Sequence, residues 1–354
     1  MVPKYEIIHQ TLLKQIEAGT LVPGTLLSSE NELAEEYGVS LITVRRAMTE
    51  LAKDGAIRRV RGKGSFVERR TPEKSYDYGE RVIAFLLNHD NNAAVSITRI
   101  ISGVQDVIAQ RGYRLLVDWN VMNGPIERAT IDRMLSNRAE GFIIYPFDPD
   151  ADKGTYARME ALGLPYVVLD RYPHDHFCAY VGSDNFVGGR LALRAFAERG
   201  HRRLAVLGNL MRLSSEQERI AGFIHTAREL GGDVRVRIIH PEEREALPHI
   251  IASEGITGLF CVNDRNAARA IQLLSASGYS VPEDVSVIGF DDCFFDASVN
   301  LQFSSVRQDF IGIGHVGAQM LLGMIQSSKY IPTKQMLGVQ MIERASSLAA
   351  PKKI

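Results

Sequence analysis

Polar side chains that could bind a hydroxylated small molecule recur after apolar segments in the C-terminal part of the chain. Carboxylate and amide oxygens accept hydrogen bonds from hydroxyl groups, and amide and guanidinium groups donate to them. The set comprises Asn88, His89, Asp90, Asp118, Asp148, Asp170, Arg171, Asn263, Asp264, Asp291 and Asp292. Any one of these residues is more often a helix cap or a solvated loop residue. Their recurrence after successive apolar segments is what predicts a shared ligand site.

The apolar segments that precede these residues have the composition of buried β-strands and alternate with helical patterns. They are short and continuous, as expected for parallel strands covered on both faces. The predicted strands span 82–87, 113–118, 141–145, 166–170, 203–207, 234–239, 258–262 and 285–290. Two such series predict two similar α/β lobes built on doubly wound parallel sheets. Ligands of these sheets bind beyond the carboxyl ends of the strands, where the polar residues fall.

A basic segment near the N-terminus could contact a polyanion. Residues 41–70 contain nine lysine or arginine and three aspartate or glutamate residues, a net charge of +6, whereas the whole chain carries −1. This local excess favours a DNA-facing module on an otherwise neutral body. From charge alone, a solvated basic face is an equally good interpretation.

The pattern of residues 1–70 is that of a helix-turn-helix followed by a β-hairpin. Apolar residues from Tyr5 to Ile16 recur at helical spacing, and a second helix is expected after the cap at Ser29. Gly38 separates it from a third helix over 41–54, and the run RRVRGKGSFV then predicts a glycine-tipped hairpin. The third helix would enter the major groove, and the hairpin would approach the backbone and minor groove. A protein-interaction module is the alternative.

The N-terminal segment from Tyr5 to Val67 resembles the GntR family of winged-helix regulators. The resemblance lies in IEAGTLVPGTLLSSENELAEEYGVS and TVRRAMTELAKDGAIRRVRGKGSFV. Together with the basic hairpin it implies DNA contacts from Ser29, Glu30, Thr43, Arg45, Arg46, Arg61, Lys63 and Gly64. The chain departs from the family at Ser28, where proline is usual, and at Leu41, where a basic residue is usual. These departures concern which half-site is read.

The remainder of the chain resembles the effector domain of the LacI/GalR family, which is similar to periplasmic sugar-binding proteins. The strongest pieces are VGSDNFVGGRLALRAFAERGHRRLAVLG, ERIAGF, LFCVNDRNAARAIQLLSASGYSVPEDVSVIGFDD, SSVRQD and IERASS. By position, the resemblance implies that Arg219, Asn263 and Asp291 contact the ligand, and that Asp170 is a less constant contact. It places Asp184 at a crossing between the lobes.

Two ligand contacts remain outside that correspondence. Asp90 is expected from its place after the first strand of the body. The resemblance also implies an aromatic ring that stacks on the apolar face of the ligand, but the chain has no obvious aromatic at the equivalent place near Pro241, and Trp119, Phe294 and Phe295 are the candidates for that role.

We therefore predict a winged helix-turn-helix domain in residues 1–69, a linker in 70–80 and a two-lobed, periplasmic-binding-protein-like body in 81–347. The chain is expected to cross between the lobes near 183, 307 and 332. The predicted function is a sequence-specific repressor of sugar-utilisation genes that a small sugar releases from double-stranded operator DNA. A co-repressor-type regulator that binds a non-sugar metabolite and, less favoured, a DNA-tethered sugar-processing enzyme are the alternatives. The resemblance implies a homodimer formed through the effector domain.

Other chemistry receives little support from the sequence. His174, His176 and Cys178 could bind a metal, but they have no strand or helix to frame them. GIGHVG at 312–317 fits a dinucleotide-binding pattern without a clear strand directly before it, which favours close helix packing instead. We expect no catalytic residues, metal or cofactor. The N-terminus has no apolar secretory core, and no apolar run approaches the roughly 18 residues of a membrane span, so we expect a cytoplasmic protein without a membrane partner.

Overall fold

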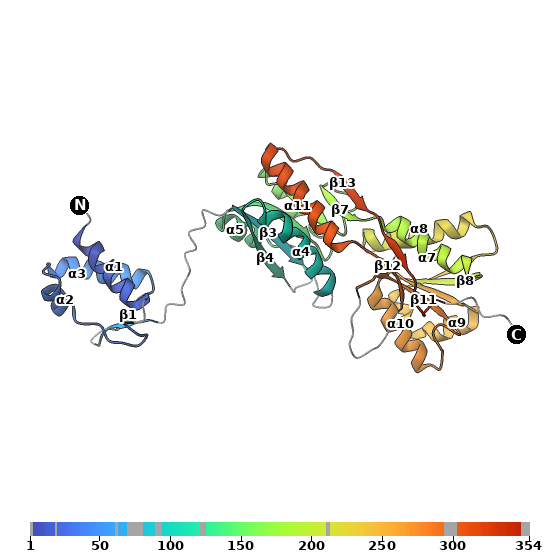
Figure 1. Cartoon of the computed structure of the whole chain (residues 1–354), viewed down its shortest axis with the longest axis horizontal. Coiled ribbons are helices and arrows are strands. Elements are labelled where there is room, and N and C mark those ends of the chain that lie inside the picture. The colour runs from blue at the N-terminus through green and yellow to red at the C-terminus, as the bar shows by residue number, and fades with distance from the viewer. Residues whose placement is uncertain are drawn as a thin grey trace. The chain divides into compact units, whose positions relative to one another are not determined.

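The computed structural model describes two compact units, and each is considered by itself. The described residues are 3–17, 20–60, 63–68, 81–88, 94–120, 125–209, 213–293 and 303–347. The units are Met1–Gly79 and Glu80–Ile354 (Figure 1).

The first unit is a winged helix-turn-helix, as the sequence predicts. Its helices are α1 (Lys4–Glu17), α2 (Glu30–Glu36) and α3 (Leu41–Lys53), and an antiparallel hairpin follows, β1 (Ile57–Val60) with β2 (Gly64–Val67). The buried side chains are Ile8, Leu12, Leu27, Leu33, Val44, Ala47, Met48, Leu51, Ala56, Ile57 and Val67. One apolar face from each element therefore builds a single small core, which holds α3 against the other two helices.

The first lobe of the second unit is a six-stranded parallel sheet between two layers of helices. The strands are β3 (Arg81–Asn88), β4 (Tyr113–Asn120), β5 (Ala139–Tyr145), β6 (Tyr166–Leu169), β7 (Tyr180–Ser183) and β13 (Lys334–Leu337), in the order β13-β7-β6-β5-β3-β4. The helices are α4 (Ala94–Ala109), α5 (Arg128–Ser136), α6 (Lys153–Ala161) and α11 (Phe310–Ser327). A separate apolar cluster fills each face of the sheet, as a strand buried on both sides requires.

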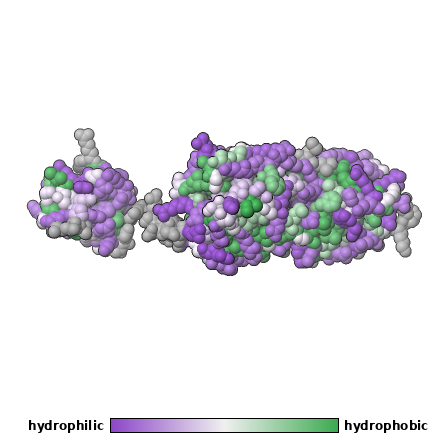
Figure 2. Space-filling view, turned by 90° about the horizontal axis from the view of Figure 1, so that it is seen from above, coloured by the Kyte–Doolittle hydropathy of each residue, from purple (hydrophilic) through white to green (hydrophobic). Residues whose placement is uncertain are grey.

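The second lobe repeats this architecture. Its strands are β8 (Arg203–Leu207), β9 (Arg235–Ile239), β10 (Gly258–Cys261), β11 (Ser286–Asp291), β12 (Ser304–Arg307) and β14 (Gln340–Ile342), in the order β14-β12-β11-β10-β8-β9. The helices are α7 (Asn185–Glu198), α8 (Ser214–Glu229), the short 3-10 helix η1 (Pro241–Ala246), α9 (Leu247–Glu254) and α10 (Asp264–Ala276). All strand pairs are parallel except β12 with β14 at the edge. In Figure 2 the visible face of the body is mainly hydrophilic, with smaller hydrophobic patches.

The chain crosses between the two lobes at three places. It passes from β7 to α7, from β12 to α11 and from β13 to β14. The third passage lies after Leu337, later than the position near 332 suggested by the sequence. Any change in the relative orientation of the two lobes would have to be accommodated at these three passages.

Two glycines bring α7 and α8 into backbone contact. A Cβ on Gly189 would lie 2.0 Å from the carbonyl oxygen of Arg219, and one on Gly222 would lie 2.0 Å from that of Phe186. Only hydrogen fits at these positions, because real Cβ atoms essentially never approach so closely. The close packing fixes the helix that carries Arg219 against the helix that begins at the first crossing.

Candidate ligand site and DNA-binding surface

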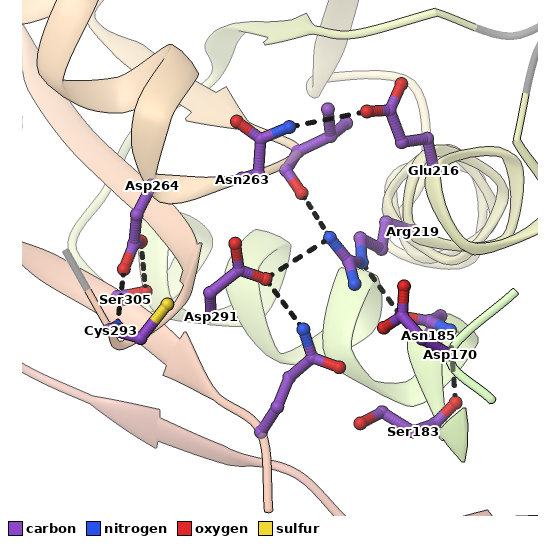
Figure 3. Close-up of polar contacts among 12 residues, drawn as sticks. Asp170, Ser183, Asn185, Glu216, Arg219, Asn263, Asp264, Asp291, Cys293 and Ser305 are labelled. Atoms are coloured by element: carbon purple, nitrogen blue, oxygen red, sulfur yellow. Dashed lines mark hydrogen bonds and ion pairs between the residues drawn. The ribbon is translucent and has the colours of Figure 1, made fainter. Parts of the chain in front are cut away.

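Arg219 lies at the carboxyl edge of the second sheet and is almost fully buried. Its Nη1 donates to the carbonyl oxygen of Val262 at 2.6 Å and lies 3.5 Å from Oδ1 of Asp291. Its guanidinium carbon is 3.8 Å from the centre of the Phe290 ring. Figure 3 shows the side chain extending from α8 towards Asp291 and Asn185. A buried, oriented guanidinium of this kind can donate to ligand hydroxyl groups.

Asp291, the last residue of β11, faces Arg219. Burial raises the pKa of its carboxyl group to about 8; the Arg219 charge opposes this rise, and the Asp264 and Asp170 charges add to it. Gln308 Nε2 donates to Asp291 Oδ1 at 2.6 Å. The φ angle of Asp291 is 121°, a conformation that is rare outside glycine. Strained backbone at a strand end is a frequent property of functional sites.

Asp170 brings a carboxyl group from the first lobe. It follows β6, it is 4% exposed, and its φ angle of 70° is again in the left-handed region. Arg171 donates from Nε and Nη2 to its Oδ2 at 3.0 and 2.9 Å, and the Tyr145 hydroxyl donates to the same oxygen at 3.3 Å. The charge of Asp170 raises the pKa of Asp291, so the carboxyl groups of the two lobes lie close enough to interact electrostatically.

Asn263 lies beside Arg219 and Asp291 and also caps a helix. Its Oδ1 accepts from the backbone N of Asn266 at 2.9 Å, which caps α10, and its Nδ2 donates to Oε1 of Glu216 at 3.3 Å (Figure 3). The structure therefore brings Asp170, Arg219, Asn263 and Asp291 into one neighbourhood. Asp90, Phe294 and Phe295 lie outside the described residues. Trp119 is 44% exposed near the end of the edge strand β4.

Direct contacts join the two lobes next to this cluster. Tyr172, in the loop after β6, donates from its backbone N to Oγ of Ser214 at 2.9 Å and from its hydroxyl to Oε1 of Glu218 at 2.6 Å. His174 bonds to Asp150 in its own lobe and, at 2.9 Å through Nε2, to Gln217 of α8. The histidine considered above as a metal ligand thus takes part in a contact between lobes.

Two functional candidates were missed by the sequence reasoning. Asn185 contacts Arg219, and Gln308 contacts Asp291. Each follows a strand, β7 or β12, that is only four residues long and contains serine, so no apolar run marked it. A search for polar residues after short strands at the lobe crossings would have found both.

In the first unit, the residues expected to contact DNA surround α3. Glu30 Oε2 accepts from Arg45 Nε at 2.9 Å, and its Oε1 accepts from Arg59 Nη2 at 2.5 Å. The guanidinium carbon of Arg46 is 4.0 Å from the centre of the Tyr5 ring. Ile42, at the start of α3, is 78% exposed. The outer side of α3 therefore combines cations and an apolar side chain, a mixture that can read base edges and thymine methyl groups.

Three of the expected DNA contacts also have local structural roles. Ser29 caps α2 in a reciprocal capping box with Glu32. The Thr43 hydroxyl lies 2.8 Å from the hydroxyl of Ser40, which caps α3. Gly64 has a φ angle of 107°, and a Cβ there would lie 2.7 Å from Leu26. Lys63 lies at the tip of the hairpin, and Arg61 lies outside the described residues.

Comparison with known proteins matches a family to part of each unit. Residues 4–67 match the gntR family of bacterial regulatory proteins, and residues 193–347 match the periplasmic binding protein-like domain. Arabinose metabolism transcriptional repressors of Halalkalibacterium halodurans and Geobacillus stearothermophilus are each 27% identical to this chain, over 93% and 92% of it and 91% and 92% of their own lengths. The chain is a transcription regulator with a GntR-family head and a periplasmic-binding-protein-like body.

The fold of this regulator's body has close structural counterparts. The crystal structure of a LacI family transcriptional regulator from Enterococcus faecalis V583, with bound ribose, is 25% identical and superposes with a TM-score of 0.63 over 76% of this chain and 99% of its own. These matches confirm the head-and-body combination that the sequence predicts. Among the described residues of the regulator, no helix is long and apolar enough to cross a membrane, and no group of His, Cys, Asp or Glu side chains is arranged to hold a metal ion.

Proposed function

We propose that this regulator represses sugar-utilisation genes and that a monosaccharide, most simply a pentose, releases it from its operator. The observation that carries the proposal is the pair formed by the buried Arg219 and the partly exposed Asp291 at the strand ends of one lobe, with the Asp170 charge of the other lobe close enough to raise the pKa of Asp291. Support comes from the relatives, two named as arabinose metabolism repressors, and from the ribose in the regulator of similar fold.

The site suits a neutral polyol in its chemistry. Arg219 supplies donors, Asp291 supplies an acceptor, and Asn263 can supply both. The two cations of the cluster, Arg219 and Arg171, already face the carboxyl groups of Asp291 and Asp170. A ligand that brings hydroxyl groups rather than a formal charge can join this set without adding a further buried charge, which would be costly if it were unpaired.

DNA binding is assigned to the head, with α3 in the major groove and the hairpin against the backbone. The described contact of Arg45 with Glu30 uses Nε, so the terminal nitrogens can face a guanine edge. Arg46, Lys63 and the hairpin residues Arg61 and Gly64 would contact phosphates or the minor groove. Ser29 and Thr43 would add backbone contacts besides their capping roles.

Control requires that the two units act together. Residues 1–69 form the reading head, 70–80 the connection, and 81–347 the sensor in this proposal. The working unit is a homodimer formed through the sensor, which lets two heads reach two half-sites. The sugar shifts the DNA-bound population through its different affinity for two arrangements of the lobes. No reaction step is involved.

The test separates ligand binding from DNA binding. Arg219→Ala and Asp291→Asn are expected to weaken binding of L-arabinose or D-ribose at least tenfold in calorimetry. The first removes a guanidinium donor, whose hydrogen bonds are worth about 1.5–3 kcal/mol, and the second replaces one carboxyl oxygen, which can accept from a ligand hydroxyl group, with an amide group that only donates. Operator binding without sugar should be retained. Arg228→Ala, on the exposed side of the same helix, is the matched control. Unchanged sugar affinity in both site variants would remove the assignment of the site.

A further inference from the structure

The first crossing between the lobes places a buried amide against the ligand arginine. Asn185, the first residue of α7, is 1% exposed. Its Oδ1 accepts from Nε of Arg219 at 2.8 Å, and its Nδ2 donates to the carbonyl oxygen of Ser183 at 3.1 Å. Ser183 belongs to β7 of the first lobe, whereas Arg219 belongs to the second. One side chain thus bonds to both lobes at the point where the chain passes between them.

The second crossing places another buried amide against the ligand aspartate. Gln308 lies between β12 and α11 and is 5% exposed. Its Nε2 donates to Oδ1 of Asp291 at 2.6 Å. Its Oε1 is buried and has no hydrogen-bond partner among the described residues. A buried acceptor without a hydrogen bond is stabilised when a donor reaches it, and a ligand hydroxyl group can be that donor.

The two amides and the two ligand residues form one continuous polar chain. It runs from Asn185 to Arg219 and then to Asp291 (Figure 3). It ends at Gln308, which donates to Asp291. The outer links are 2.8 and 2.6 Å long, within the range of strong hydrogen bonds. The central link between Arg219 and Asp291 is 3.5 Å and therefore the weakest. A ligand that bonds to both central residues changes this link first.

Each amide is next in sequence to an aspartate that caps the helix at its crossing. Asp184 caps α7 by accepting from Val187 N at 3.0 Å, and Asp309 caps α11 by accepting from Gly312 N at 2.8 Å. The φ and ψ angles of these two caps are −73° and 79°, and −90° and 75°. Each capped helix is stiff, so a change of lobe orientation must concentrate around its start. Gln308 lies just before the cap of α11, and Asn185 lies just after the cap of α7 as its first helical residue.

We infer that Asn185 and Gln308 are positioning residues that connect ligand binding at Arg219 and Asp291 to two of the hinges between the lobes. The inference rests on the proposed function and says which residues transmit the effect of ligand binding to the crossings between the lobes. When a ligand binds to Arg219 and Asp291, the hydrogen bonds from this pair to the two amides change. Each amide then favours a different backbone conformation at its crossing between the lobes. The alternative is that the two amides only fill the core at the junction.

An experiment without ligand tests whether the two ends of this polar chain, Asn185 and Gln308, are energetically coupled. Asn185→Asp keeps the acceptor for Arg219 but loses the donor to Ser183, and Gln308→Met keeps the volume but loses both polar atoms. Urea denaturation of the full-length regulator gives the unfolding equilibrium constant of each single variant and of the double variant. We expect the double variant to differ from the product of the single effects by at least threefold, because both amides belong to one hydrogen-bonded network. Since neither amide contacts the other directly in the described structure, such coupling must pass through Arg219 and Asp291. Additive effects would overturn the continuous chain.

A second experiment tests transmission, with the ratio of operator dissociation constants in saturating and in zero L-arabinose as its readout. Both variants are expected to lower this ratio at least threefold while operator binding without sugar changes less than twofold. Thr226→Val is the matched control, since it removes a buried polar group on α8 whose bond is to its own helix. It should lose stability but keep the ratio. Wild-type ratios in both amide variants would refute the inference, whereas a wild-type regulator that ignores the sugar would refute the proposed function.

Discussion

Asp152 should make the body less stable as the pH rises. It precedes α6, it is 0% exposed, and its Oδ1 accepts from the backbone N of Ile126 at 2.6 Å. Its Oδ2 has no partner among the residues that the structure describes. Burial raises the pKa of this carboxyl group to about 7, compared with about 3.9 for an unfolded aspartate.

The sign of the effect follows from proton binding. Between about pH 4 and pH 7 the folded protein holds a proton on Asp152 that the unfolded chain has released, so the free energy of unfolding falls as the pH rises. This destabilisation by the Asp152 charge is complete above pH 7 and absent below pH 4. Asp152→Asn keeps an acceptor for Ile126 and has no charge to bury. Its stability advantage over the wild type should grow by roughly 3 kcal/mol between pH 5 and pH 8.

Thermal unfolding measured at pH 5 and pH 8 checks this value. For a unit of this size the added advantage corresponds to roughly 6–12 °C in Tm. The control is Asp233→Asn, which changes an exposed aspartate in the turn before β9 and should give the same small difference at both pH values. An Asp152→Asn advantage that does not depend on pH would show that the carboxyl group is ordinarily charged in the fold.

Three further predictions concern helix packing, helix capping and DNA reading. Gly189→Ala should destabilise the body by at least about 1–3 kcal/mol and weaken sugar binding, because its Cβ meets the backbone of Arg219; Gly323→Ala, with open space around it, should be neutral or stabilising, and equal effects would contradict the packing argument. Ser29→Ala should speed hydrogen exchange of the α2 amides about fivefold, the equivalent of a lost cap of about 1 kcal/mol; unchanged exchange would argue against the capping box. Arg45→Ala should weaken operator binding by about 1–3 kcal/mol and relax the preference at one base pair; an unaltered gel-shift titration would exclude base reading by this residue.

The fold was accessible from the sequence because its elements are marked locally. Continuous apolar runs identified most strands of the two sheets, and the capping serine and the glycine before α3 marked the helix-turn-helix. The short strands β7, β12, β13 and β14 were not predicted, since they contain few large apolar residues and owe their place to pairing with a neighbouring strand. Long-range pairing of this kind has no local signal.

The candidate site was accessible only in part for the same reason. Arg219 and Asp291 could be placed by a family resemblance, but their link to Asn185 and Gln308 depends on the close approach of segments far apart in the chain. The role of Gly189 likewise becomes visible only when α8 lies against α7. Ser29 and Thr43 show the opposite case, in which residues expected at the DNA also cap the helices that present it.

The most direct test is fluorescence anisotropy of a labelled duplex from the upstream region of the regulator's own gene, titrated with the full-length protein with and without L-arabinose. The account predicts salt-dependent binding that the sugar weakens by roughly 5–150-fold, the usual range of allosteric coupling. The Arg219→Ala variant should bind the duplex equally well in both conditions. Failure of the wild-type protein to bind the duplex, or binding that neither L-arabinose nor D-ribose changes, would contradict it.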